Sequence, residues 1–197
     1  MQKPSMSRSR FLQSTGAAAI WLPTTVRGYS ANEVQALYVD GEMQGEVSKW
    51  ELDTPSLCVD LDLLEENIAK MQATLSTNSL ASRPHAKTHK TPIIAQMQLD
   101  AGSVGICTAK VSEAEVMFQN GIDSILMTTT NVTSTKIRRA MELRQSCAGF
   151  IQATDSAVNA RLLSEAAVSM NISADVVVDV DPGGHRTGIT PGQPALE

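Results

Sequence analysis

The segment from Arg83 to Lys90, Arg-Pro-His-Ala-Lys-Thr-His-Lys, concentrates residues that could do chemistry. Its pattern favours a strand, and alternate side chains of a strand point to the same face, so His85, Lys87 and His89 would share one face. Burial and nearby positive charges lower the pKa of a lysine, which turns it into a nucleophilic amine able to form a Schiff base. The sequence therefore predicts a carbonyl-binding role for Lys87, with an exposed polar edge strand as the alternative.

The two histidines allow a second interpretation of the same segment. They are four residues apart, a spacing that can hold zinc when it falls on a helix. Pro84 and Pro92 confine the segment, however, and its alternation suits a strand. We therefore expect no metal site from His85 and His89 alone.

The elements that must position this segment repeat along the chain from Asp53 onward. Short apolar runs, helical periodicity and caps predict strands centred near residues 86, 106, 126, 151 and 178, with helices between them. An additional strand is predicted over 56–60, and capping boxes are predicted at Asp62 and Ser112, each with Glu three residues later. Alternation of strands and helices is typical of βα units that build a parallel sheet.

Two architectures fit this alternation, an open doubly wound sheet or part of a (β/α)8 barrel. The first strand–helix turn has no Gly-x-Gly-x-x-Gly loop, which argues against a dinucleotide fold, and no Walker loop is present. A complete barrel takes about 250 residues, more than the 197 of this chain. We predict an α/β fold with about five βα units of a TIM-type barrel over 53–197, preceded by a linker over 36–52.

Residues 1–35 stand outside this fold prediction. All charged residues among the first thirty are basic, and a short apolar run over 17–22 follows the first three of them, which is the layout of an export signal. The string from Arg8 to Gln13 resembles a twin-arginine signal in which Ser9 replaces the second arginine. The sequence leaves two alternatives, export to the periplasm through a degenerate signal of this kind or a disordered N-terminal tail on a cytoplasmic protein.

The composition excludes several classes of partner. The chain has 16 Lys and Arg against 21 Asp and Glu, a net charge of -5, without a basic block, so we expect no nucleic acid. No stretch of about 18 apolar residues occurs, so we expect no membrane span in the mature protein. Three cysteines are too few and too scattered for a disulfide framework or a zinc cluster.

Two strings in the sequence resemble those of a known family. The string from Asp53 to Leu57, Asp-Thr-Pro-Ser-Leu, followed by Arg-Pro-His-x-Lys-Thr-His-Lys, is similar to the D-threonine aldolase / D-serine dehydratase family. That family belongs to the alanine-racemase-like, fold-type III enzymes that use pyridoxal 5'-phosphate (PLP). The resemblance covers about three quarters of the chain. It implies that Lys87 carries PLP as a Schiff base and that His85 also lies at the cofactor.

The second string runs from Asp179 to Gly188, Asp-Val-Asp-Pro-Gly-Gly-His-Arg-Thr-Gly. The resemblance implies that its arginine, Arg186, lies by the cofactor and donates to the phenolic oxygen. An ordinary loop arginine is the alternative. The activity implied for the family is a PLP-dependent lyase acting on D-3-hydroxy amino acids, either by retro-aldol cleavage of D-threonine-like substrates or by dehydration of D-serine. Its partner would be a small-molecule D-amino acid.

Members of this family are about twice as long, with eight barrel strands and a C-terminal β-domain. The resemblance therefore implies that this chain is a fragment without that domain. For the full-length parent it also implies a divalent metal, held by C-terminal ligands absent here, and a homodimer. Two alternatives stay open: a non-catalytic truncated remnant, and an amino-acid racemase of the same fold. The Arg-Pro-His-x-Lys-Thr-His string favours aldolase or dehydratase over racemase.

Overall fold

The computed structural model describes residues 28–40 and 42–196. The chain divides into two compact units, Met1–Ile68 and Ala69–Glu197, and helix α3 (Leu61–Thr77) runs through the boundary between them. The export-signal prediction rests on residues 1–27, which lie outside the described residues. Among the described helices, none is both long and apolar enough to cross a membrane.

The first unit consists of short elements. Helix α2 (Ala31–Ala36) begins at a capping box made by Ser30 and Glu33. Strands β1 (Tyr38–Val39) and β2 (Glu42–Met43) form an antiparallel hairpin, and the 3-10 helix η1 (Lys49–Glu51) follows. These elements show that the segment predicted to be a linker has local structure of its own.

The strand predicted over 56–60 is not formed. Residues 53–60 have no strand and are exposed throughout. A strand is held by hydrogen bonds to a neighbouring strand, and no described strand pairs with this segment. The side chain of Asp60 instead caps α3, where its Oδ1 accepts from Leu63 N at 3.1 Å. The capping box predicted at Asp62 was therefore two residues too late, because Asp60 holds the N-cap position of α3.

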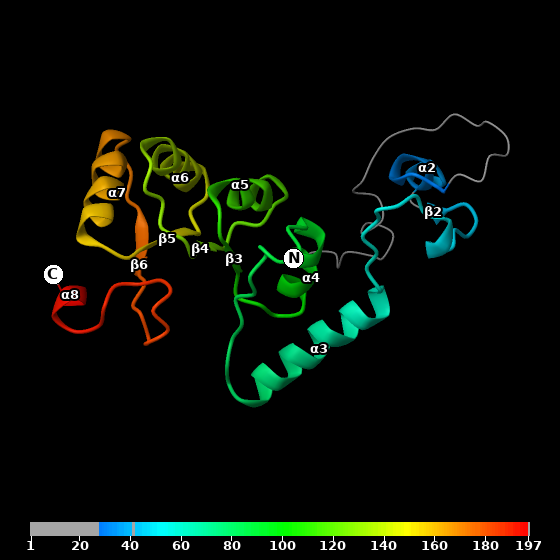
Figure 1. The fold of residues 1–197 in the computed structure, drawn as a ribbon, viewed down its shortest axis with the longest axis horizontal. Coiled ribbons are helices and arrows are strands. Elements are labelled where there is room, and N and C mark those ends of the chain that lie inside the picture. Colours follow the sequence, from blue (N-terminus) through cyan, green and yellow to red (C-terminus); the bar gives the residue numbers. More distant parts are fainter. Residues whose placement is uncertain (1–27, 41, 197) are drawn as a thin grey trace, which may run out of the picture. The chain divides into compact units, whose positions relative to one another are not determined.

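The second unit is built on a parallel sheet (Figure 1). Its strands are β3 (Ile106–Thr108), β4 (Ile125–Met127), β5 (Phe150–Thr154) and β6 (Asp175–Val178), and they pair in the order β3-β4-β5-β6. An isolated parallel β-bridge between His85 and Cys107 places the chain at His85 beside β3. The prediction of an α/β fold with a parallel sheet is confirmed.

Helices connect the strands and cover one face of the sheet. They are α4 (Pro92–Asp100), α5 (Val111–Gln119), α6 (Ser134–Ser146) and α7 (Ala157–Ser169), with a short α8 (Gln193–Leu196) after β6. Figure 1 shows α5, α6 and α7 side by side along the sheet. Ile106, Ile125 and Phe150 pair in register and are fully buried beneath these helices, so the core lies between the helices and the sheet.

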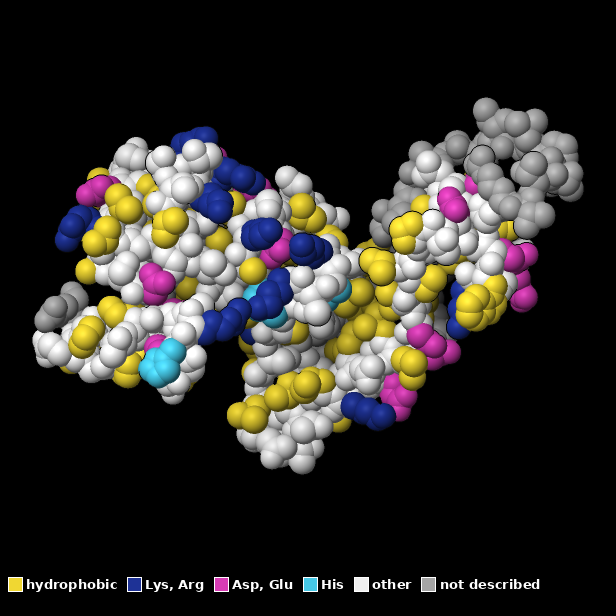
Figure 2. All heavy atoms as spheres, in the orientation of Figure 1, with side chains coloured by type: hydrophobic (Ala, Val, Ile, Leu, Met, Phe, Trp, Pro, Cys, Tyr) yellow, Lys and Arg dark blue, Asp and Glu magenta, His cyan; other side chains and the backbone are white. Residues whose placement is uncertain are grey.

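Large apolar side chains also lie on the surface of both units (Figure 2). Trp50 and Leu57 are exposed in the first unit, and Val132 and Val168 are exposed in the second. The strand β6 is exposed along its whole length. The described residues thus bury one face of the sheet thoroughly and leave its β6 edge open.

Candidate active site

The parallel strands bring several loops to one edge of the sheet. In a parallel sheet all carboxyl ends lie at the same edge, and in α/β barrels the functional residues gather there. Lys87 follows the segment that pairs with β3, and Arg186 follows β6. The two predicted cofactor residues therefore belong to the same edge, at opposite ends of the strand order.

Lys87 lies in a tight turn and not in a strand. Only His85 pairs with β3, through Cys107, and residues 86–89 form a turn. The turn is closed by a hydrogen bond in which Lys90 N donates to Ala86 O at 2.7 Å. The prediction that His85, Lys87 and His89 share one strand face was therefore wrong, since the chain bends directly after His85.

The side chain of Lys87 is exposed. The predicted burial of this lysine was wrong because the described residues enclose only the helix-covered face of the sheet. No carboxylate among the described side chains pairs with its Nζ. Lys87 thus offers a primary amine without a competing acidic partner, on a backbone that the turn holds in place.

His85 is half-buried and hydrogen-bonded on both ring nitrogens. Its Nε2 lies 3.1 Å from Oγ1 of Thr128, and its Nδ1 accepts from Lys87 N at 3.3 Å. Burial lowers the pKa of His85, and the positive charge of Lys87 lowers it further, whereas the charge of Glu113 acts in the opposite direction. The neutral imidazole is therefore favoured beside Lys87.

His89 is hydrogen-bonded to Thr91, the residue that precedes α4. Its Nδ1 accepts from Thr91 N at 3.0 Å, and its carbonyl accepts from Thr91 Oγ1 at 2.7 Å. Its Nε2 is buried without a hydrogen-bond partner among the described residues. Burial lowers the pKa of His89. Within the described part of the chain no group of three His, Cys, Asp or Glu is arranged to hold a metal ion.

Glu113 is a residue at this edge that the sequence interpretation missed. It is buried at the start of α5, where its Oε2 accepts from Ala109 N at 2.9 Å and from Lys110 N at 3.3 Å. Its Oε1 lies 3.8 Å from Nζ of Lys90, at the end of the turn that carries Lys87. The capping box was predicted two residues too late, at Ser112. The detectable signal was a Glu three residues after Lys110.

Arg186 lies in an exposed loop organised by Asp181. The carboxylate of Asp181 accepts from Gly183 N at 2.9 Å and from His185 N at 3.0 Å, and these backbone donors lower its pKa. The His185 imidazole also lies 3.1 Å from Asp181 Oδ2. No hydrogen bond or ion pair among the described residues joins Arg186 to Lys87. The structure places both at the carboxyl edge of the sheet, Lys87 beside β3 and Arg186 after β6.

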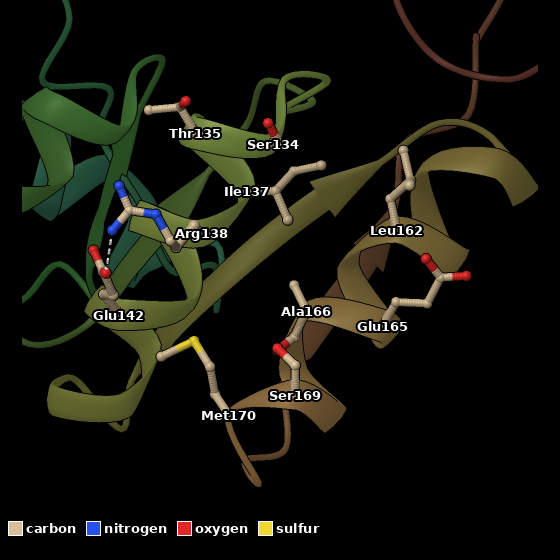
Figure 3. A pocket seen from close by; sticks show the side chains of 10 residues that line it. All are labelled: Ser134, Thr135, Ile137, Arg138, Glu142, Leu162, Glu165, Ala166, Ser169 and Met170. Atoms are coloured by element: carbon tan, nitrogen blue, oxygen red, sulfur yellow. Dashed lines mark hydrogen bonds and ion pairs between the residues drawn. The ribbon is translucent and has the colours of Figure 1, made fainter.

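A groove on the helical layer is separate from this edge (Figure 3). It has a volume of about 510 Å3 and lies between α6 and α7. The ion pair between Arg138 Nη1 and Glu142 Oε1, at 2.6 Å, lies on its α6 side. The lining includes neither Lys87, His85 nor Arg186, so the groove is not the predicted cofactor site.

The groups at the carboxyl edge fit an aldehyde cofactor with an oxygen substituent. Lys87 supplies a free amine on a fixed backbone, and Arg186 supplies an exposed guanidinium with five N–H donors. Hydrogen bonds from Gly183 N and His185 N to Asp181 fix the backbone of the loop that bears Arg186. The assignment of Lys87 and Arg186 to a cofactor stays a prediction.

Comparison with known proteins agrees with this fold. Residues 59–197 match the family model described as "Alanine racemase, N-terminal domain". The chain is 40% identical over 139 residues to a D-threonine aldolase of Arthrobacter sp, covering 71% of this chain and 36% of that protein. It is 35% identical over 148 residues to a 3-hydroxy-D-aspartate aldolase of Paracoccus denitrificans, covering 75% and 38%.

Solved structures give the same result. The D-threonine aldolase from Filomicrobium marinum superposes with a TM-score of 0.71 at 40% identity, covering 74% of this chain and 39% of that one. The D-threo-3-hydroxyaspartate dehydratase from Delftia sp. HT23 has a TM-score of 0.68 at 31% identity, covering 74% and 38%. The chain thus spans well under half the length of these proteins, and the prediction of a partial alanine-racemase-like barrel is confirmed.

Proposed function

Because this chain belongs to the alanine racemase N-terminal domain family of fold-type III PLP enzymes, we propose that it contributes Lys87 to a PLP-dependent lyase acting on D-3-hydroxy amino acids. One observation carries the proposal. The amine of Lys87 is exposed at the carboxyl edge of the sheet, without an acidic partner among the described residues, on a backbone held by His85.

The substrate class is supported by the names of the similar proteins. Two are aldolases of D-threonine and 3-hydroxy-D-aspartate, and one is a dehydratase of D-threo-3-hydroxyaspartate. All three names share a D-amino acid with a 3-hydroxyl group. Higher identity to the aldolases, 40% and 35% against 31%, favours cleavage between Cα and Cβ as the reaction. D-threonine would then yield glycine and acetaldehyde.

Each residue at the edge has a defined part in this proposal. PLP, when bound, supplies an electron sink for negative charge that develops at Cα of an amino acid. Lys87 would hold the cofactor through Nζ, the amine that would bind its aldehyde carbon. Arg186 would donate to its phenolic oxygen, and His85 holds the Lys87 backbone. A divalent metal and a homodimer stay predictions for the full-length parent.

The attachment is tested by covalent labelling of the 197-residue chain. The purified chain is mixed with PLP, reduced with borohydride to make any link to lysine permanent, digested and mapped by mass spectrometry. We expect the label on Lys87, and we expect Lys87→Ala to remove it. Lys90→Ala is the matched control, since Lys90 is an exposed lysine in the same turn. Label that persists in Lys87→Ala would contradict the proposal.

The reaction class is tested by product analysis. The chain loaded with PLP is incubated with D-threonine, D-serine, and L-threonine as the stereochemical control. Glycine and acetaldehyde from D-threonine alone would support the aldolase. Ammonia and pyruvate from D-serine would support the dehydratase, and conversion of D-threonine into L-allo-threonine by inversion at Cα would support a racemase. If Lys87 is labelled but no product forms, the chain binds cofactor without catalysis, which is the non-catalytic alternative.

A further inference from the structure

The hydrogen bonds around His85 determine which of its ring nitrogens carries the proton. Oγ1 of Thr128 lies 3.1 Å from the carbonyl oxygen of Thr108 and 3.1 Å from Nε2 of His85. A carbonyl can only accept, so the single hydroxyl proton of Thr128 points to Thr108. The hydroxyl then has only lone pairs for His85, and Nε2 must be the donor.

The other ring nitrogen is fixed by Lys87. The backbone N–H of Lys87 points at Nδ1 of His85, with a distance of 3.3 Å between the nitrogens. A backbone N–H can only donate, so Nδ1 must be unprotonated. His85 is therefore neutral, with its proton on Nε2. A charged imidazole would have donors on both nitrogens and would lose the bond from Lys87.

Both ring nitrogens are thus used within the protein. His85 has no remaining lone pair or ring N–H with which to exchange a proton with a bound molecule. The same residue also holds the turn through its carbonyl, which accepts from Thr88 Oγ1 at 3.1 Å. The charges that act on the imidazole are those of Lys87 and Glu113, and Glu113 in turn pairs with Lys90.

We propose that His85 and Thr128 are positioning residues, which fix the backbone of Lys87 through a one-way hydrogen-bond chain from Lys87 to Thr108. The role as a positioning residue rests on the proposed function, because it concerns the lysine that attaches PLP. In this proposal His85 affects the reaction only by fixing the backbone of Lys87. Thr128 becomes part of the site, although it is 41 positions farther along the sequence than Lys87.

The tautomer is measured in the 197-residue chain without any cofactor. Two-dimensional 15N NMR of the histidine side chains distinguishes a protonated Nε2 from a protonated Nδ1. At neutral pH we expect His85 to have its proton on Nε2, and we expect Thr128→Val to change the tautomer balance. A proton on Nδ1, or a charged ring, would overturn the inference. This result does not depend on whether the chain binds PLP, so failure of the proposed function would be recognised separately.

The positioning role is measured by the rate at which PLP attaches to Lys87. We expect Thr128→Val to slow attachment by about tenfold, because a misplaced nucleophile loses part of its orientation. Thr128→Ser keeps the hydroxyl and should restore the rate. Thr129→Val is the matched control, since Thr129 is an exposed neighbour. Equal rates for Thr128→Val and the unaltered chain would overturn the positioning role. Slow attachment in Thr128→Ser would also overturn it.

Discussion

Gly188 packs directly against the backbone of Asp181. A Cβ built on Gly188 would lie 2.5 Å from Asp181 N and 2.6 Å from the carbonyl carbon of Val180, which is closer than real Cβ atoms come to backbone. Gly188 also has a φ of +93°, in the region that favours glycine. The contact joins the two ends of the loop that carries Arg186, so this glycine fixes the path of the loop.

Replacing Gly188 should therefore disturb the Arg186 loop. We expect Gly188→Ala to weaken PLP binding about tenfold, because backbone strain of about 1–3 kcal/mol would be relieved by moving the loop. The measurement is a PLP titration followed by absorbance. Gly184→Ala is the control within the same loop, since a Cβ there meets nothing within 4 Å. Equal affinities for the two variants would show that the loop does not reach the cofactor.

The pKa of His85 should respond in opposite directions to its two charged neighbours. Lys87 lowers this pKa and Glu113 raises it. We therefore expect Lys87→Met to raise the pKa of His85 and Glu113→Gln to lower it, as followed by NMR titration of the ring. Shifts of the same sign in both variants would show that structural rearrangement, and not charge, dominates.

Folding stability should decrease in acid. Burial lowers the pKa of His85 and of His89 below 6.5, so the unfolded chain binds protons more readily than the folded chain. The stability that the neutral rings provide is fully present above the unfolded value and is lost as the pH falls through the folded values. Urea unfolding should therefore give a lower midpoint near about pH 5 than near about pH 7.5.

The His89→Gln variant checks the source of this pH dependence. Its side chain does not titrate, so the difference in unfolding free energy between the two pH values should become smaller. The residual difference should come partly from His85. An unchanged difference in His89→Gln would contradict a contribution from this ring.

A buried amide network holds the loop that precedes α6. Asn131 Nδ2 donates to Gln152 Oε1 at 2.8 Å, Gln152 Nε2 donates to Thr129 O at 3.0 Å, and Asn159 Nδ2 donates to Asn131 O at 2.6 Å. Leucine at Gln152 would leave the Asn131 amide without this partner in the core. We expect Gln152→Leu to destabilise the chain by about 1–3 kcal/mol in urea unfolding.

The control for this network is a glutamine on the surface. Gln145 is exposed on α6, and Gln145→Leu should change the unfolding free energy by less than about 0.5 kcal/mol. If both glutamine variants lower the free energy of unfolding by the same amount, the network contributes no more to stability than a surface side chain does.

The sequence predicted the elements well where local signals define them. Thr91 followed by Pro92 is a local signal for a helix start, and α4 begins at Pro92. Apolar runs predicted the four strands of the second unit, three of which are mostly buried, whereas β6 is apolar but exposed. The strand over 56–60 was predicted from the same kind of local signal, and it did not form because a strand also requires a partner that local sequence does not specify.

The candidate site, like the fold, was predicted by the sequence only where local signals define it. The sequence by itself determined the family and singled out Lys87, because the residue types and spacing of the Arg83–Lys90 string are local properties of the chain. Only the tertiary structure decided that Lys87 lies in a turn, that its side chain is exposed, and that His85 bonds to Thr128. That bond joins residues 43 positions apart, and such a distance is closed by the pairing of parallel strands, which no local pattern encodes.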